Sequence, residues 1–399
     1  MSARLIYECS SMGAAWRAMI VGLLGAVLVL AAAWPAAAEG AIAAERVSTV
    51  FINPGKRGDV FWDMIVDTMQ AAAAHLRIDL EVIYAERSSR LMQVLGMSVV
   101  KRPVQPQLLI LSNEDNAGVP ILEAANAAGI RTLLISNDVA GRDKARLLGP
   151  RVHLSHWVGS LMPDIEAAGV RMAEKLTGTA RRQGLQAADG RLHILVLAGA
   201  AKSPSGFDWE RGASRFLKTQ PDVVTDRTLV ANWNANDAEE LTENYIAWAK
   251  RKNIRVAGVL AGNDPMALGA IKAIRSAGLK PGHDVLVAGL NWSPHALASV
   301  QAGEMLLTDG GHFLMGLWSM IMLRDMVDGC DGFAKGKPTL LPMAFVTRKS
   351  ADAVLSVMRE GFFQKLDVDR LRAKAGNACR PYDFSLYALF QALPVTGWE

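Results

Sequence analysis

The 399-residue sequence lacks the short motifs that mark many enzyme families. It contains no Gly-x-Gly-x-x-Gly after a strand, no Gly-x-x-x-x-Gly-Lys-Ser/Thr, no His-Glu-x-x-His and no Gly-x-Ser-x-Gly. Its seven histidines are scattered, and its three cysteines form no cluster with metal-ligand spacing. We therefore expect a protein that is not an enzyme and that holds no metal and no cofactor.

The sequence also lacks a run of lysines and arginines with interleaved aromatic residues. The net charge of +4 is small and is spread along the chain, so a nucleic-acid partner is not expected. Hydrophobic residues make up 51% and charged residues 21% of the chain, which is ordinary for a globular protein. The length is sufficient for two domains with cores of their own.

Charge is absent from Ala18 to Trp34, a run that follows Arg17. The run leads into small residues that end at Ala38. A basic flank, an apolar core and a small-residue exit are typical of a secretory signal peptide. A retained membrane anchor is the alternative, since the run approaches the ~20 residues that span a bilayer. The small-residue exit favours cleavage, so we predict a signal peptide over residues 1–38.

Short apolar runs alternate with segments of helical spacing along most of the chain. The predicted strands are residues 47–53, 80–84, 107–112 and 131–136, followed by 192–198, 228–231, 256–261 and 285–290. This alternation with short turns predicts α/β structure with a doubly wound parallel sheet. Because the pattern restarts after a polar loop at residues 177–191, we predict two similar lobes with a cleft between them.

The most informative stretch is Val256–Ile271. An apolar run typical of a buried strand breaks before Asn263, and a helix follows with Asp264 as its predicted N-cap and Pro265 at its first position. Asn263 is thereby placed at the carboxyl end of a parallel sheet, where open α/β sheets bind ligands. A turn residue is an equally good explanation of Asn263, whereas capping is a sufficient role for Asp264.

The segment Ala261–Ala270 resembles the signature of the type I periplasmic binding proteins, which include ribose-binding-like and autoinducer-receptor-like members. In that family the Asn at the place of Asn263 reaches into the cleft and hydrogen-bonds the ligand. LacI-type transcription regulators share the motif. They would need a helix-turn-helix before the first strand, where this chain has the apolar signal.

The resemblance covers residues 47–360 and implies a three-segment hinge, with crossings between the lobes that we place near residues 150, 308 and 335. The predicted organisation is a signal peptide at 1–38, an N-terminal lobe from 39–150 and 308–335, a C-terminal lobe from 151–307 and 336–365, and a tail at 366–399.

The resemblance also indicates ligand contacts in the first lobe. The family places a polar residue and two aromatic residues after the first strand, and the matching residues are Trp62, Phe61 and Asp59, in that order of preference. The aromatic rings would stack on a sugar-like ring, or one of them would pack in the core. Asn137 and Asp138 follow the fourth strand, where sugar-binding relatives hold hydroxyl groups. Turn chemistry explains them equally well, and no Arg is adjacent as in those relatives.

Five further candidates follow from the resemblance. Trp209, at the start of a predicted helix over 209–219, takes the place of a family arginine, and Arg211 lies two residues later. A solvated surface position is equally consistent for Arg211. Trp233 takes the place of an aromatic residue that stacks on the ligand, and Asn291 that of a ligand-gripping Asp. Asp309 is expected to contact the ligand or to brace the hinge.

After removal of the signal, Cys330 and Cys379 are the only cysteines. An oxidising compartment and an even count favour a disulfide. Two free thiols are an equally good expectation, because sequence spacing does not show proximity.

Together these features predict a periplasmic solute-binding protein. It would capture a small polar, sugar-like ligand between the lobes and present it to the membrane permease of an ABC transporter. The segment Gly310–Phe313 resembles the autoinducer-receptor-like branch, so the alternative is a ligand-sensing adaptor for a membrane sensor kinase. His312 is left out of the predicted site, because a His at a helix start more often caps or packs.

Overall fold

The computed structural model describes residues 45–200, 204–358, 363–376 and 378–392. The predicted signal peptide at residues 1–38 lies outside this part of the chain. From Arg46 onward the chain forms a single unit that contains two lobes. In the described ranges, no helix is both long and apolar enough to cross a membrane.

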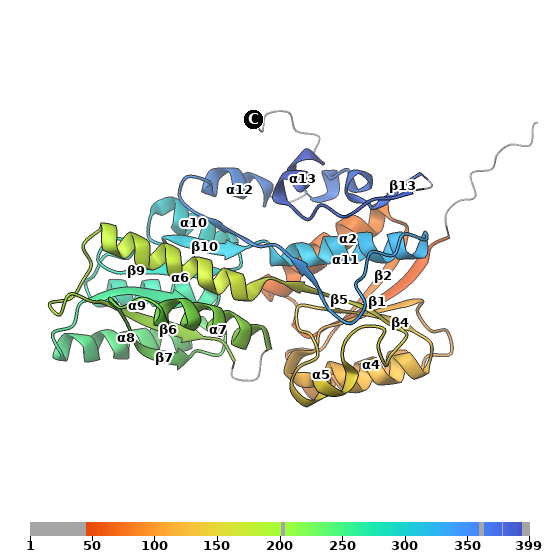
Figure 1. The fold of residues 1–399 in the computed structure, drawn as a ribbon, viewed down its shortest axis with the longest axis horizontal. Coiled ribbons are helices and arrows are strands. Elements are labelled where there is room, and N and C mark those ends of the chain that lie inside the picture. Colours follow the sequence, from red (N-terminus) through yellow and green to blue (C-terminus); the bar gives the residue numbers. More distant parts are fainter. Residues whose placement is uncertain (1–44, 201–203, 359–362, 377, 393–399) are drawn as a thin grey trace, which may run out of the picture. The chain divides into compact units, whose positions relative to one another are not determined.

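The first lobe is built on a six-stranded parallel sheet, drawn mostly in orange and yellow in Figure 1. The strand order is β11-β5-β4-β3-β1-β2. The strands are β1 (Val47–Asn53), β2 (Ile78–Tyr84), β3 (Leu108–Leu111), β4 (Arg131–Ile135), β5 (Trp157–Pro163) and β11 (Thr339–Leu341), and the helices are α2 (Val60–His75), α3 (Ser89–Val100), α4 (Gly118–Ala127), α5 (Gly141–Leu147) and α11 (Met315–Val327).

Strand β1 shows why these residues form a central strand. Its Phe51 packs into the core under α2 and α11, whereas Val50 and Ile52 pack into the core under α3 and α4. Side chains alternate across a strand, so a strand that is covered on both faces must be apolar almost throughout. This requirement produces the continuous apolar runs in the sequence.

The second lobe repeats this design with the strand order β12-β10-β9-β8-β6-β7, in which only β12 is antiparallel to its neighbour. The strands are β6 (Leu192–Ala198), β7 (Val223–Val230), β8 (Val256–Ala261), β9 (Leu286–Leu290), β10 (Leu307–Gly310) and β12 (Ala344–Val346), and the helices are α6 (Ile165–Arg182), α7 (Pro204–Lys218), α8 (Ala235–Arg251), α9 (Asp264–Ser276), α10 (Pro294–Ala302) and α12 (Ala351–Val357). The two sheets confirm the predicted fold class.

The chain crosses between the sheets near Asp164, Gly311 and Pro342, because β5, β10 and β11 end just before these residues. The predicted crossings at 150 and 335 are therefore corrected, and the second lies close to the predicted 308. The first crossing lies later than predicted because β5 still belongs to the first lobe. This buried strand is hard to recognise in the sequence, since it contains a Gly, a Ser and a Pro. The third crossing lies later because β11, which has only three residues, stays with the first sheet.

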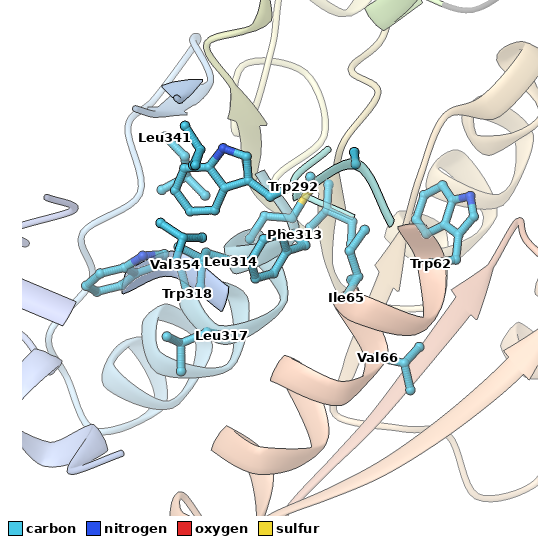
Figure 2. Packing of buried hydrophobic residues seen from close by; sticks show 14 of the residues in the cluster. Trp62, Ile65, Val66, Trp292, Phe313, Leu314, Leu317, Trp318, Leu341 and Val354 are labelled. Carbon is cyan, nitrogen blue, oxygen red and sulfur yellow. The ribbon is translucent and has the colours of Figure 1, made fainter. Parts of the chain in front are cut away.

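A hydrophobic core joins the two lobes at the crossings (Figure 2). Trp292, which follows β9 of the second lobe, packs edge-to-face on Phe313 with ring centroids 6.3 Å apart. Phe313 begins the second passage through the first lobe, and Ile65 of α2 lies beside it in Figure 2. The indole N–H of Trp292 donates to the carbonyl of Ala344 at 3.0 Å, which ties the third crossing to the same point.

The C-terminal segment, which the sequence pattern did not place, packs on the first lobe. After α12 on the second lobe, the chain returns with η3 (Phe363–Lys365) beside α2. It continues through η4 (Val368–Leu371), β13 (Lys374–Ala375), β14 (Ala378–Cys379) and α13 (Leu386–Gln391) (Figure 1). Three kinds of contact hold it there: an ion pair between Arg372 and Asp325 at 2.7 Å, an edge-to-face contact between Phe384 and Trp318, and a disulfide between Cys330 and Cys379. The disulfide alternative is thus the one that the structure shows.

Candidate functional site

A cavity of about 670 Å³ lies between the carboxyl ends of the parallel strands of the two sheets. Its lining comes from both lobes and includes seven of the eleven predicted residues: Asp59, Phe61, Trp62, Asn137, Trp233, Asn263 and Asn291. Small-molecule sites usually have volumes of about 300–1,000 Å³ and occur at such interfaces. The cavity therefore has the position and the size of a site for a small ligand.

The aromatic wall of the first lobe comes from the first turn of α2. Trp62 is 3% exposed, and its indole lies over Gly55, where a Cβ would collide with it. Phe61 is only partly buried and stacks on His312, with ring centroids 4.8 Å apart and planes at 27°. From the sequence, Trp62 is preferred over Phe61 as a ligand contact. In the structure Phe61 is the more exposed of the two rings, and Trp62 packs mainly in the core.

Charged groups lie beside this wall. Asp59, just before α2, forms an ion pair with Arg87, which follows β2. Glu114 borders the same part of the cavity, and burial raises the pKa of its carboxyl group to about 7. Neither Arg87 nor Glu114 was predicted from the sequence. The available signal was their place in the loops just after β2 and β3, at the carboxyl edge of the sheet.

Asn137 connects the two sides of the cavity. Its side-chain Nδ2 donates to Glu114 Oε2 at 2.8 Å in the first lobe. Its Oδ1 accepts a hydrogen bond at 3.1 Å from the backbone N–H of Ser205, in the first turn of α7 of the second lobe. The described geometry is thus one in which the lobes touch across the cleft.

On the second lobe, Asn263 is the N-cap of α9. Its Oδ1 accepts from the backbone N–H of Met266 at 2.9 Å, and its Nδ2 donates to the carbonyl of Trp233 at 3.2 Å. The predicted cap, Asp264, is instead the first helical residue and is wholly buried. Burial raises the pKa of Asp264 to about 6, while its oxygens accept hydrogen bonds from Thr308 Oγ1 and the backbone of a neighbouring loop. Asn263 therefore borders the cavity and caps a helix at once.

The position of the Trp233 side chain is set by a backbone turn and by two glycines that leave space for the indole. Asn232 and Trp233 have φ of 51° and 61°, in the left-handed region that non-glycine residues seldom adopt. The indole lies against Gly199 and Gly262, and a Cβ at Gly199 would overlap it. The turn thus presents a partly buried aromatic ring to the cavity, and Gly199 supplies the space behind it.

Asn291 has a strained backbone, with φ of 144°, and the next residue, Trp292, has φ of 58°. Trp292 is 4% exposed and lies over Gly310. Trp292 therefore belongs to the core, whereas its neighbour Asn291 lines the cavity. The Asn291 side chain borders the cavity and has no hydrogen-bond partner among the residues described here. Strained backbone of this kind clusters at ligand sites, where it fixes the direction of a side chain.

Trp209 and Arg211 do not line the cavity, contrary to the prediction. Helix α7 begins at Pro204, earlier than predicted, so Trp209 lies more than a turn inside it. Its indole is 0% exposed, and the indole N–H donates to Met172 Sδ at 3.3 Å. Arg211 is on the surface, where it pairs with Glu166 at 2.5 Å.

Asp138 and Asp309 are likewise outside the lining. Asp138 Oδ1 accepts a hydrogen bond from Ser160 Oγ at 2.9 Å. Asp309 pairs with Arg171 of α6 at 3.0 Å and is 0% exposed, so its bracing role is the one that its position supports. Burial raises the pKa of both carboxyl groups. Throughout the described ranges, no group of three or more His, Cys, Asp or Glu side chains could hold a metal ion.

Comparison with known proteins places this geometry in a family. The family model described as "Periplasmic binding protein domain" matches residues 49–330. Among solved structures, a periplasmic sugar-binding protein from Pseudomonas fluorescens is 29% identical with a TM-score of 0.76, and the match covers 86% of this chain and 99% of that one. A Caulobacter myo-inositol binding protein is 19% identical, with a TM-score of 0.65 over 79% of this chain and 98% of that chain, and shows the same fold.

The curated relatives match over shorter stretches. The galactofuranose-binding protein YtfQ of Escherichia coli is 29% identical over 112 residues, which are 28% of this chain and 35% of the relative. The xylitol-binding protein of Mycolicibacterium smegmatis is 25% identical over 259 residues, which are 65% of each chain. The aligned part thus spans less than two thirds of these relatives. The family model, in contrast, covers most of this chain together with the cavity, and the chain belongs to the periplasmic binding protein family.

Proposed function

We propose that this protein is exported to the periplasm, captures a sugar-like ligand between its lobes and presents the closed form to the membrane permease of an ABC transporter. One observation carries the proposal: a single cavity has aromatic rings and amide side chains from both lobes in its lining. A ligand that contacts both lobes binds the closed arrangement more tightly than the open one. It stabilises the closed arrangement by that difference in binding free energy.

The chemistry of the lining fits a compact ligand with several hydroxyl groups. Phe61 and Trp233 offer ring faces for the C–H side of such a ligand. Asn291, Asp59 and Glu114 offer amide and carboxyl groups that exchange hydrogen bonds with hydroxyls. Asp59 and Phe61 come from the start of α2, whereas Glu114, Trp233 and Asn291 come from three other segments that only the fold brings to the same cavity.

The relatives support this ligand class and this use. Their names specify galactofuranose, xylitol and D-allose, all polyhydroxylated molecules. A further relative, 25% identical over 193 residues, is named a D-apiose import binding protein of Actinobacillus succinogenes. Delivery to a transporter is therefore favoured over an adaptor role for a sensor kinase, and binding without turnover is favoured over catalysis.

The test uses the exported protein. Native mass spectrometry identifies any molecule that co-purifies, and isothermal titration with D-allose, L-arabinose, myo-inositol and xylitol measures affinity. We expect at least one of these probes to bind with a Kd at or below the micromolar range and to be recovered unchanged. Absence of binding by all four at millimolar concentration, or conversion of the bound probe, would contradict the proposal.

A further inference from the structure

His312 borders the cavity, although the family resemblance assigns it no role in binding. It begins η2 (His312–Leu314), just after the second crossing between the lobes, and is 3% exposed. Its imidazole stacks on Phe61 at 4.8 Å. The pair therefore forms one continuous aromatic surface, with one ring from the crossing and one from the first lobe.

The two nitrogens of this ring have different surroundings. Nδ1 is sealed from solvent and has no hydrogen-bond partner in the part of the chain that the structure describes. Burial lowers the pKa of His312 to about 3, so the ring is neutral at pH 7 and carries a single N–H. A sealed N–H without an acceptor is less tolerable than a sealed bare nitrogen, which places the proton on Nε2.

We infer that His312 contacts the ligand, donating from Nε2 to a ligand oxygen, while its ring and Phe61 together face the apolar side of a cyclic sugar or cyclic polyol. This inference rests on the proposed function and narrows its ligand class. A cyclic ligand has a flat C–H face that matches the paired rings, whereas an acyclic polyol must first be ordered to present one. The carboxylate of Asp59, which pairs with Arg87, offers only acceptors, so His312 supplies a neutral donor that Asp59 does not.

The experiment compares affinities by isothermal titration of the full chain with three cyclic probes, D-allose, L-arabinose and myo-inositol, and with acyclic xylitol. For the wild type we expect a cyclic probe to bind most tightly. His312→Phe keeps the stacked ring and loses the N–H, so it should weaken that probe about tenfold or more. His312→Gln keeps a side-chain donor but loses the ring, so it should bind that probe more tightly than His312→Phe and less tightly than the wild type. His153→Phe makes the same chemical change at an exposed position outside the cavity and should leave the affinity unchanged.

A folded His312→Phe protein that binds within twofold of the wild type would overturn the inference, as would tighter binding of xylitol than of every cyclic probe. If His312→Phe does not fold, nitrogen-15 NMR of the wild-type histidines decides, with the His312 signals assigned from the His312→Gln spectrum. A shift of the His312 ring nitrogens on saturation with the tightest probe supports the contact, and unchanged signals refute it. Failure of all four probes to bind the wild type is a different result, since it overturns the proposed function and this inference with it.

Discussion

Replacing Trp233 by Ala separates a ligand-binding side chain from a core side chain. The indole lies over Gly199 and Gly262, is only partly buried and borders the cavity. Its removal widens a space that already opens to the cleft and does not leave a closed void. A core Trp lost to Ala costs about 3–5 kcal/mol of stability. For Trp233→Ala we expect the free energy of unfolding of the ligand-free protein to fall by less than about 2 kcal/mol.

The effect on binding should be larger than the effect on folding. A stacked aromatic ring contributes beyond its buried area, and side chains at the centre of a site carry much of the affinity. We expect a loss of about 1–3 kcal/mol, or roughly 5- to 150-fold in Kd, for whichever of the four probes the wild type binds most tightly.

The assay pairs isothermal titration with thermal melts in the absence of ligand. Trp248→Ala is the matched control, because Trp248 is a partly buried tryptophan of the same lobe that packs on Tyr245 and Arg227 away from the cavity. We expect wild-type affinity for this control. If Trp233→Ala melts far below the control and still binds like the wild type, Trp233 is a core residue and the site is misassigned.

Three further predictions test neighbouring parts of the structure. Asn263→Ala removes both a helix cap and a cavity amide, so it should lower stability by about 1 kcal/mol and weaken the tightest probe by a further ~1–3 kcal/mol; Asn263→Ser, which keeps a capping oxygen, should recover the melting temperature and not the affinity. Glu114 binds more protons in the folded than in the unfolded protein between pH 4.5 and about 7, so its contribution makes the free energy of unfolding fall as the pH rises through that window. Glu114→Gln removes this dependence, and its melting temperature relative to the wild type should therefore rise from pH 4.5 to pH 8; a constant difference would refute a raised pKa. The disulfide between Cys330 and Cys379 closes a loop with a sequence separation of 49 residues, and its reduction should cost roughly 4 kcal/mol in the chain-entropy model; two thiols titrating in the denatured, non-reduced protein would show that it does not form.

Much of the fold could be predicted because each central strand is covered on both faces. The apolar runs at Val47–Asn53 and Leu192–Ala198 are visible in the sequence for that reason, and each is a strand of the structure. Strand β5 was missed because Gly159, Ser160 and Pro163 weaken the local signal, while pairing with β4 and β11 holds it in place. The first crossing was misplaced as a consequence.

The candidate site divides in the same way. The position of Asn263 beside the cavity could be predicted because a buried strand, a polar tip and a helix with an early Pro lie within one short stretch, and local rules place such a tip at the edge of a sheet. Trp209 was misassigned because the start of α7 decides which way its ring points, and the sequence did not fix that start. Sequence spacing predicts which helix or strand a residue belongs to more reliably than it predicts the direction in which the side chain points.

The sequence by itself therefore determined the two-lobed α/β architecture, the strand ends that border the cleft and the Asn at the start of α9, since each depends on residues within a few turns of one another. Only the tertiary structure decided that Glu114, Arg87 and His312 border the same cavity, that Asp309 pairs with Arg171 and that Cys330 pairs with Cys379. These relations join residues far apart in the chain. They depend on how three crossings and a returning C-terminal segment bring the two lobes together, which no local pattern records.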